Sequence, residues 1–377
     1  MNNLNEKEKH YEIIVLEKEK FKKAARKKFI YLISLICLLV IFAVISFSVG
    51  ASSVNFKDFI NVFTEKIFGF PEMSDVKRQI VWAIRMPRVC AAILAGMSLS
   101  ASGILMQGIF QNALVSPYTL GVSNGAAFGA SVAIIFGYKT LPIKMWQYVL
   151  PAGAFIFAIF SMILVYFIAT LAKDNTKTLI LSGVAVGYLF SALVASMKYI
   201  SDVRELPELV FWTMGGLSNV SWLGIGLMFI ASFSGFLIMM RFAWELNVMS
   251  SGEETALSLG VNYKFITRIF FVTATLMTAT AVSFTGVIGF VGLIAPHITT
   301  MLFGGDYRYN IPASCLLGAL LLLLSDTLSR IIIAPSELPV GVITSLIGVG
   351  WGRWRPRWAP MPPRPPNPSW RRWATSC

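Results

Sequence analysis

Long uncharged stretches constrain this chain more than any other feature. A membrane-crossing helix needs about 20 apolar residues, and several runs of that length lack Asp, Glu, Lys and Arg: residues 29–49, 89–110, 118–138, 146–171, 179–197 and 220–240. The 37-residue run 269–305 is too long for one helix, so we expect two spans that turn near Thr285-Gly286 and Gly289. With 311–325 and 331–349 the count reaches about ten. The sequence predicts an all-α polytopic membrane protein.

The positive charge is concentrated at the two ends of the chain. Of the net charge of +13, residues 1–28 contribute nine Lys/Arg against five Glu, and residues 350–377 contribute six Arg and no acid. This is not the distribution of a nucleic-acid-binding surface. A basic segment before the first span instead predicts a cytoplasmic N-terminus by the positive-inside rule. An even number of spans then places 241–268 in the cytoplasm.

Three segments follow from this pattern. Residues 1–28 form a basic cytoplasmic tail and 29–349 the transmembrane domain. Residues 350–377 hold five of the ten Trp and seven of the 17 Pro, a density of Pro that no spanning helix tolerates. We interpret this segment as a frameshift or chimaeric junction near residue 349 that truncates the last span. The alternative is a genuine Trp/Arg-rich tail at the membrane interface.

The sequence lacks the residues that chemistry within the chain would need. The four Cys are scattered, no Gly-x-x-x-x-Gly-Lys-Ser/Thr phosphate-binding loop occurs, and His297 has no suitably spaced partner for a metal. We therefore expect no metal, no bound cofactor and no ATPase activity of its own. An ion-coupled secondary transporter of a small solute is the alternative function. Its spans usually carry ionisable residues at mid-membrane, whereas these are almost free of Asp and Glu. A membrane-embedded enzyme would need a clustered catalytic set.

A short polar segment, LNVMSSGEETALSLG at 246–260, separates two apolar runs. Ser250 and Ser251 precede Glu253 and Glu254 at the spacing of a capping box, and Gly260 stands where a helix ends. Ala256, Leu257 and Leu259 give the predicted helix, about 250–260, a small apolar side. A membrane protein that presents such a helix in a cytoplasmic loop offers it to a soluble partner.

Several motifs occur in order along residues 30–349. They are RMPR at 85–88, GILMQGIFQNALVSPYTLGVSNGAAFGA at 103–130, LILSGVAVG at 179–187, FWTMGGLSNVSW at 211–222, GEETALSLGV at 252–261, GFVGLIAPHITTMLFGGDYR at 289–308 and DTLSRIIIAPSELPVGVITSLIG at 326–348. Together they resemble the FecCD-type permeases, the membrane subunits of ATP-binding-cassette importers for iron–siderophore complexes, haem and cobalamin.

The resemblance implies an assembly and a mechanism. It implies a type II importer bundle of ten helices per subunit, paired as a homodimer or with a homologous permease, and two cytoplasmic ATPase subunits that bind the ATP. An extracellular or periplasmic binding protein would deliver the ligand. A ferric siderophore is the leading ligand, with haem and cobalamin as alternatives.

The resemblance also implies residue roles. The ATPase-coupling residues would be Gly252, Glu253, Glu254, Ala256, Ser258, Leu259 and Gly260. External arginines that pair with acidic residues of the binding protein would be Arg85, Arg88 and Arg330. Residues that shape the translocation path would be Asn112, Pro117, Gly121, Ser123, Asn124, Asn175 and Thr176.

Each role has a structural alternative that the sequence leaves open. The coupling segment could be a solvated connector, and the arginines could extend from span ends toward the membrane surface. The path residues could form a packing turn with its caps, or tight cytoplasmic loops. Asp326 and Glu337, the acids near the external face, are expected to balance Arg330 rather than to contact substrate.

Overall fold

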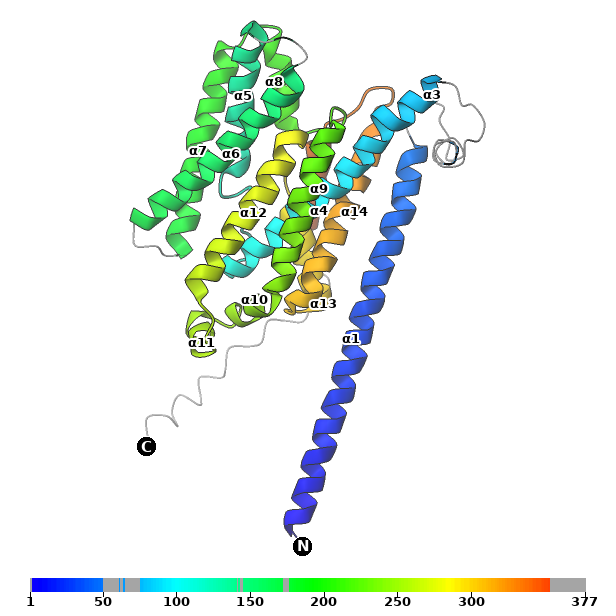
Figure 1. Ribbon diagram of the computed structural model, residues 1–377, viewed down its shortest axis with the longest axis vertical. Coiled ribbons are helices and arrows are strands. Elements are labelled where there is room, and N and C mark those ends of the chain that lie inside the picture. The colour runs from blue at the N-terminus through cyan, green and yellow to red at the C-terminus, as the bar shows by residue number, and fades with distance from the viewer. Residues whose placement is uncertain are drawn as a thin grey trace.

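The computed structural model describes residues 2–49, 75–140, 145–171 and 176–352, with positions 61, 64 and 142 (Figure 1). The helices in this part of the chain are α1 Asn2–Ser48, α3 Asp75–Gln79, the π-helix Ile80–Arg85, α4 Met86–Phe110, α5 Val122–Thr140, α6 Trp146–Leu171, α7 Thr176–Ile200, α8 Glu205–Met214, α9 Trp222–Arg241, α10 Ala243–Met249, α11 Glu253–Ser258, α12 Tyr263–Thr285, α13 Val291–Phe303, α14 Tyr307–Ile331 and α15 Val340–Gly352.

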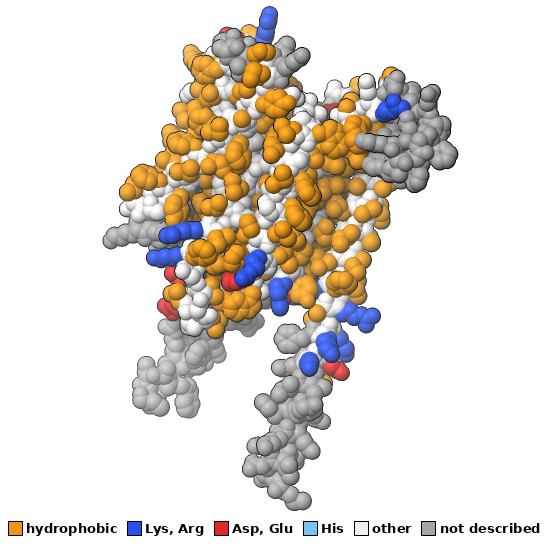
Figure 2. Space-filling model, viewed as in Figure 1, with side chains coloured by type: hydrophobic (Ala, Val, Ile, Leu, Met, Phe, Trp, Pro, Cys, Tyr) orange, Lys and Arg blue, Asp and Glu red, His pale blue; other side chains and the backbone are white. Residues whose placement is uncertain are grey.

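Within the described residues, seven helices are long and apolar enough to cross a membrane. Three shorter apolar stretches, Val122–Gly137, Val291–Phe303 and Val340–Gly350, raise the number of apolar helices to ten. Figure 2 shows hydrophobic side chains over the middle of the bundle and charged side chains toward its ends. The prediction of an all-α polytopic membrane protein is confirmed. The predicted break after Thr285 is also present, because α12 ends there and α13 begins at Val291.

Three element boundaries differ from the predictions. The N-terminal tail and the first span form one helix, α1, about 70 Å long at 1.5 Å per residue. The segment 200–219, which lies between two predicted spans, contains α8, whose first turn carries Glu205 and Glu208 as the helix dipole favours. The last apolar helix begins at Val340 rather than residue 331, because Pro335 and Pro339 prevent a continuous helix after α14. Residues 353–377 lie outside the described part.

The bundle has two distinct ends. The N-terminal part of α1 extends beyond the same end of the bundle as α10 and α11, whereas α3, α8 and the α14–α15 connection lie at the opposite end (Figure 1). These ends are called the α10–α11 end and the α8 end below. Because α4, α9, α12 and α14 run between them, a change at one end can reach the other through these helices (Figure 1).

Small residues allow α4 to pack closely at the centre of the bundle. The backbone of Gly96 lies against Gly318 of α14, and Gly103 lies against Gly292 of α13. Serine and threonine hydroxyls complete these contacts through the pairs Ser98–Ser232, Ser100–Ser314 and Ser102–Thr278. Because lipid supplies no hydrophobic force between helices, such close packing and hydroxyl pairs hold the bundle together.

We predict that Gly103→Ala destabilises the bundle. A Cβ at this position would overlap the carbonyl oxygen of Gly292, and overpacking of this kind costs about 1–3 kcal/mol. The matched control is Gly226→Ala on α9, where nothing lies within 4 Å of the added carbon. Thermal unfolding followed by size-exclusion chromatography should show a lower Tm for Gly103→Ala alone. Equal losses in both variants would contradict the packing model.

Candidate functional site

The predicted coupling segment forms two short helices rather than one. α10 ends at Met249, and α11 begins after Gly252, whose φ of 110° only glycine adopts readily. The expected capping box is absent: Gly252 is the N-cap, and the Ser250 hydroxyl donates to the carbonyl of Asn247 in the preceding helix. The side chain of Ser250 is thus used to end α10, and a tight turn separates the two helices.

Helix α11 presents a mixed acidic and apolar surface. Glu253 and Glu254 in its first turn are exposed, and only Ala256 is buried against the bundle. Leu257 and Leu259, expected beside Ala256, point outward and are 59% and 57% exposed. Exposed leucines next to carboxylates form a surface that suits a soluble partner better than solvent. Of the other residues assigned to this segment, Ser258 and Gly260 are exposed as well.

Side chains from two other segments fix α10 to the bundle. The Asn247 amide donates to Asp306 Oδ1 at 3.2 Å and accepts from the backbone N–H of Tyr307 at 2.8 Å, which joins α10 to the start of α14. Gln111, just after α4, donates to the carbonyl of Met249 at 2.8 Å. Movement of α10 would therefore be passed directly to α4 and α14.

Gln111, Asn247 and Asp306, which make these contacts, were not among the predicted site residues. Asp306 could have been predicted from the sequence, because an Asp before an apolar run is an N-cap signal. In the structure its side chain accepts from the Arg308 N–H at the start of α14. Hydrogen bonds from Arg308 and Asn247 hold the pKa of the Asp306 carboxyl below its usual value. The carboxylate is thus ionised at neutral pH, and its stabilising contribution is lost only as the pH falls through that lowered pKa. Asn247 and Gln111 carry no comparable local signal.

At the α8 end, the three predicted docking arginines are buried, each at most 8% exposed. Arg330 donates to the carbonyls of Ser46 and Val49 at 3.1 and 2.8 Å, and Arg85 donates to the carbonyl of Phe47. Carbonyls at a helix C-terminus have no partner within the helix and carry partial negative charge. The two guanidinium groups therefore stabilise the end of α1 against α4 and α14.

The carboxylate of Asp326 joins two of these arginines. Its Oδ1 accepts from Arg88 Nε at 2.8 Å, and Oδ2 lies 3.1 Å from Arg330 Nη2, with the side chain of Asp326 fully buried. Arg88 also donates to Glu337 at 2.8 Å. Asp326 thus pairs with Arg330, as expected, and also with Arg88. Glu337, which was expected to balance Arg330, pairs with Arg88 instead. A docking role for the arginines stays a prediction, because their donors contact groups of this chain.

A pocket of about 720 Å³ opens beside this network at the α8 end. Its lining combines both signs of charge with aromatic rings: Arg88, Arg204, Glu208, Glu337, Trp146, Phe211 and Trp212. The pocket reaches down to Gly215 and Gly286. A second space of about 370 Å³, lined by Tyr118, Phe290 and Gly341 among others, adjoins the same region through Met214 and Val287.

Gly215, Gly286 and Gly341 lie between these two spaces, where α8 and α12 end and α15 begins. A side chain at Gly215, Gly286 or Gly341 would overlap a backbone carbonyl of Val287, Trp212 or Met214, respectively. The three backbone segments form hydrogen bonds with one another. The Gly216 N–H donates to the carbonyl of Thr285 at 2.8 Å, and the Val340 N–H donates to the carbonyl of Gly215 at 3.1 Å. Non-helical backbone at membrane depth is tolerated where it is buried in protein or lines a cavity. This glycine junction was missed as a unit by the sequence analysis.

The predicted path residues lie mainly at a packing turn between α4 and α5. The amide of Asn124 donates to the carbonyl of Gly187 on α7 at 2.9 Å, and Gly121 accepts from Ser161 on α6 at 3.0 Å. Ser123 and Pro117 are buried. These contacts match the packing alternative, and a role in the path stays a prediction.

The remaining predicted positions are separate from that turn. Asn112 is exposed beyond α4, where its side chain accepts from Leu114 N–H. Asn175 lies outside the described residues, as does the side chain of Thr176 at the start of α7. His297 is half-buried on α13. In the part of the chain that the structure describes, no group of three or more His, Cys, Asp or Glu side chains could hold a metal.

We predict that Asp326→Asn severely destabilises the protein. The substitution leaves Arg88 and Arg330 buried without their shared counter-charge, and breaking a buried pair in this way costs about 3–5 kcal/mol. Glu337→Gln is the matched control, because that side chain is 45% exposed and its ion pair with Arg88 lies at the edge of the network. Membrane yield and Tm should fall much further for Asp326→Asn. A stable Asp326→Asn protein would show that the network does not hold α1 and α14 together.

Known proteins resemble this chain over most of its length. Residues 38–350 match the model of the FecCD transport family. The hemin transport system permease HmuU of Yersinia pestis is 35% identical over 320 residues, 85% of this chain and 93% of that protein. The iron(3+)-hydroxamate import permease FhuB of Bacillus subtilis is 36% identical over 322 residues, 85% and 81% of the two chains.

A solved structure agrees with these matches. It represents an inward-facing conformation of a metal-chelate type ABC transporter, and it superposes with a TM-score of 0.74 and 33% identity over 85% of this chain and 96% of its own. The family match, the two relatives and the shared fold lead to one conclusion: this chain is a member of the FecCD transport family of ABC importer permeases.

Proposed function

We propose that this chain is the membrane-spanning subunit of an ATP-driven importer that translocates a ferric siderophore. The observation that carries the proposal is the family match over residues 38–350. Relatives that import hemin and iron(3+)-hydroxamate support a metal chelate as the cargo. A binding protein would deliver the chelate at the α8 end, and two separate ATPase subunits would supply the energy.

The pocket at the α8 end supports a large amphipathic ligand. Its volume of about 720 Å³ falls in the range of sites for drug-sized molecules. Trp146, Phe211 and Trp212 offer aromatic surface, while Arg88, Arg204, Glu208 and Glu337 offer donors and acceptors. A ferric siderophore has both apolar and polar surface, which this combination suits. Haem and cobalamin share these properties and remain the alternatives.

The assembly follows from the same proposal. We infer a homodimer, or a pair with a homologous permease, in a bacterial cell membrane, with the N-terminus and the α10–α11 end in the cytoplasm. The basic residues of 1–28 favour this orientation through the positive-inside rule. The ATPase subunits would then contact Glu253, Glu254, Leu257 and Leu259 of α11, which are exposed at that end.

Energy would reach the spans through α10. ATP binding and hydrolysis in the partner would shift α10 and α11 together, and the hydrogen bonds of Asn247 and Gln111 would pass that shift to α14 and α4. Rigid helices that move at an interface can alternate the access of a central path between the two sides. The chain itself carries out no covalent step.

The ion-coupled alternative has weaker support. A secondary transporter binds its coupling ion at charged groups near mid-membrane. Asp326 is a buried carboxylate in a spanning helix, but Arg88 and Arg330 occupy its oxygens. Binding a cation there would require breaking both ion pairs.

The uptake experiment uses the host with its chromosomal gene deleted. We expect loss of uptake of one ligand from a panel of labelled ferric siderophores, haem and cobalamin, restored by the wild-type gene. Glu253→Arg with Glu254→Arg should fail to restore it, because reversed charge on α11 opposes docking of the ATPase. Glu19→Arg, which reverses an exposed carboxylate of α1, should restore it fully. Restoration by the α11 double variant would overturn the coupling role, and loss of none of these ligands would overturn the substrate class.

A second prediction separates docking from transmission. Asn247→Ala should leave co-purification of the ATPase subunits unchanged and lower ligand uptake several-fold, because it removes the hydrogen bonds between α10 and α14. Asn262→Ala is the control: it removes an N-cap bond of α12, worth about 1 kcal/mol, without separating α10 from α14. Equal uptake in the two variants would contradict transmission through Asn247.

A further inference from the structure

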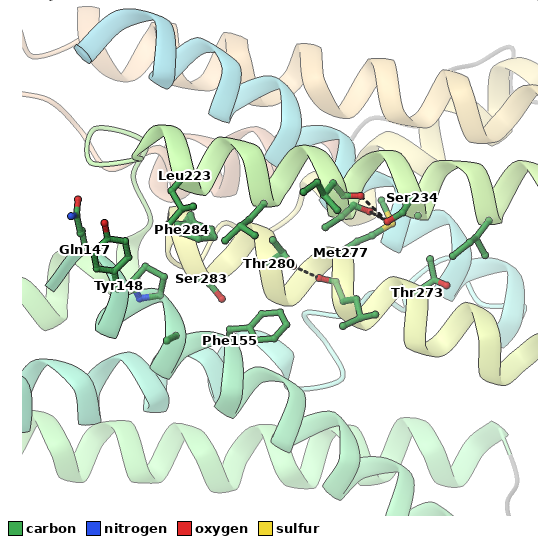
Figure 3. Close-up of a pocket in the computed structure, with 18 residues that line it drawn as sticks. Gln147, Tyr148, Phe155, Leu223, Ser234, Thr273, Met277, Thr280, Ser283 and Phe284 are labelled. Atoms are coloured by element: carbon green, nitrogen blue, oxygen red, sulfur yellow. Dashed lines mark hydrogen bonds between the residues drawn. The ribbon is translucent and has the colours of Figure 1, made fainter. Parts of the chain in front are cut away.

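A groove of about 480 Å³ runs between α6, α9 and α12 (Figure 3). One end adjoins the pocket at the α8 end, with which the groove shares Gln147, Pro151, Ser283 and Phe284. All three helices are membrane-crossing candidates. In Figure 3, α12 lies between the other two, and its residues Met277 and Thr280 face the space. Along α9 the lining extends from Leu223 to Ile238, about 22 Å at 1.5 Å per residue. This is most of the depth of a hydrocarbon core about 30 Å thick.

Three of the hydroxyl groups along the groove are engaged with their own helices. Ser234 donates to Ile230 at 2.7 Å, Thr280 to Leu276 at 2.8 Å and Ser283 to Ala279 at 2.5 Å. Figure 3 shows the first two of these bonds as dashed lines. Because each hydroxyl has one proton, these side chains have none left to donate to a ligand. The wall therefore suits hydrocarbon and gives a polar molecule little to bind.

Small side chains leave the groove open on the side of α6. Pro151 and Ala152 of α6 face Ala231 of α9 across the space. On the other side, the bare backbone of Gly235 lies against Met277, so α9 and α12 are closely packed. The volume is thus bounded by rigid contacts between α9 and α12 and is not filled by any described side chain.

The groove changes character at the end nearest α8. Gln147 and Tyr148 line it there, beside Leu223 (Figure 3). Pro151 lacks an N–H, so it cannot donate to the carbonyl of Gln147 four residues earlier. An amide, a phenol and a backbone carbonyl therefore lie at the mouth of an apolar groove. This order of groups, polar at the surface and apolar along the depth, matches a phospholipid.

We propose that the groove binds one acyl chain of a membrane phospholipid from the leaflet at the α8 end. The chain lies along α12 between α6 and α9, and the glycerol ester region contacts Gln147 and Tyr148. The lipid then fills the space between α6 and α9 and supports their separation. This binding site includes no residue of α10 or α11, and it meets the proposed ligand pocket at Gln147 and Pro151.

The test uses full-length protein in nanodiscs that contain phosphatidylglycerol and phosphatidylethanolamine, with a phospholipid that carries a diazirine in mid-chain. After irradiation, peptide mass spectrometry should place adducts on α9 and α12 at groove residues such as Leu227 and Leu276. Leu227→Trp, which adds an indole to the groove, should lower this adduct about tenfold. Leu237→Trp, on the exposed face of the same helix outside the groove, should leave it unchanged.

Two results would overturn the proposal. Adducts spread evenly over the exposed faces, including Phe229 and Phe233 of α9, would indicate ordinary bilayer contact. Equal labelling of the groove in Leu227→Trp and wild type would show that no chain occupies it. The adduct map of the wild-type protein alone distinguishes labelling of the groove from even labelling. This part of the test therefore does not depend on folding of the variant.

Discussion

The fold depends on the need to satisfy every backbone polar group away from water. In hydrocarbon this requirement allows helices and excludes exposed irregular chain. The described spans meet it through their helical hydrogen bonds, apart from the positions opposite Pro151, Pro296 and Pro312. The non-helical backbone at the ends of α8 and α12 and at the start of α15 meets it through mutual hydrogen bonds. Gly216 donates to Thr285 and Val340 to Gly215, so the ends of α8, α12 and α15 satisfy one another. The absence of side chains at Gly215, Gly286 and Gly341 allows this, because any Cβ there would meet a carbonyl. The glycine junction thus permits non-helical backbone between two open spaces.

Helix α14 connects the two ends of the bundle through polar contacts at its termini. At its start, Asp306 and the N–H of Tyr307 bond to Asn247 of α10. Near its end, Asp326 binds Arg88 of α4, and Arg330 binds the carbonyl of Ser46 in the last turn of α1. Between these points it packs through Gly318 on Gly96 with almost no space for adjustment. A helix held so closely moves as a unit, which is what a mechanism driven from the α10–α11 end requires.

The spans were predictable from sequence because each depends on local composition. A charge-free run of about 20 residues has few alternatives to a membrane helix, and the break at Gly286 was marked by the length of its run. The contacts of Arg88 with Asp326 were not predictable in this way, because the two residues are 238 positions apart. Arg85, Arg88 and Arg330 lie together at the α8 end, but nothing local indicates that burial would turn them toward the chain's own carbonyls and carboxylates.

The capping error at Ser250 has a similar cause. Ser250 and Glu253 have the spacing of a capping box, but the backbone ends α10 at Met249 first, and the Ser250 hydroxyl is used there. Propensity identified a polar helical segment and could not divide it. The division matters, because α10 is bound to α4 and α14 while α11 is held by Ala256 and presents its other residues outward. Two short helices thus separate the exposed residues of α11 from the contacts that α10 makes with the spans.

Small residues accompany close helix packing in one part of the bundle and an open groove in another. The difference lies in the neighbouring helices. At Gly103 and Gly292, small residues face each other across two straight helices, so the backbones touch. Ala152 and Ala231 both line the groove, where Gly235 lies against Met277 and holds α9 close to α12 while the space beside α6 stays open. The same composition therefore closes one interface and opens a groove at another. This is why small residues along a span do not by themselves indicate where the bundle leaves an open groove.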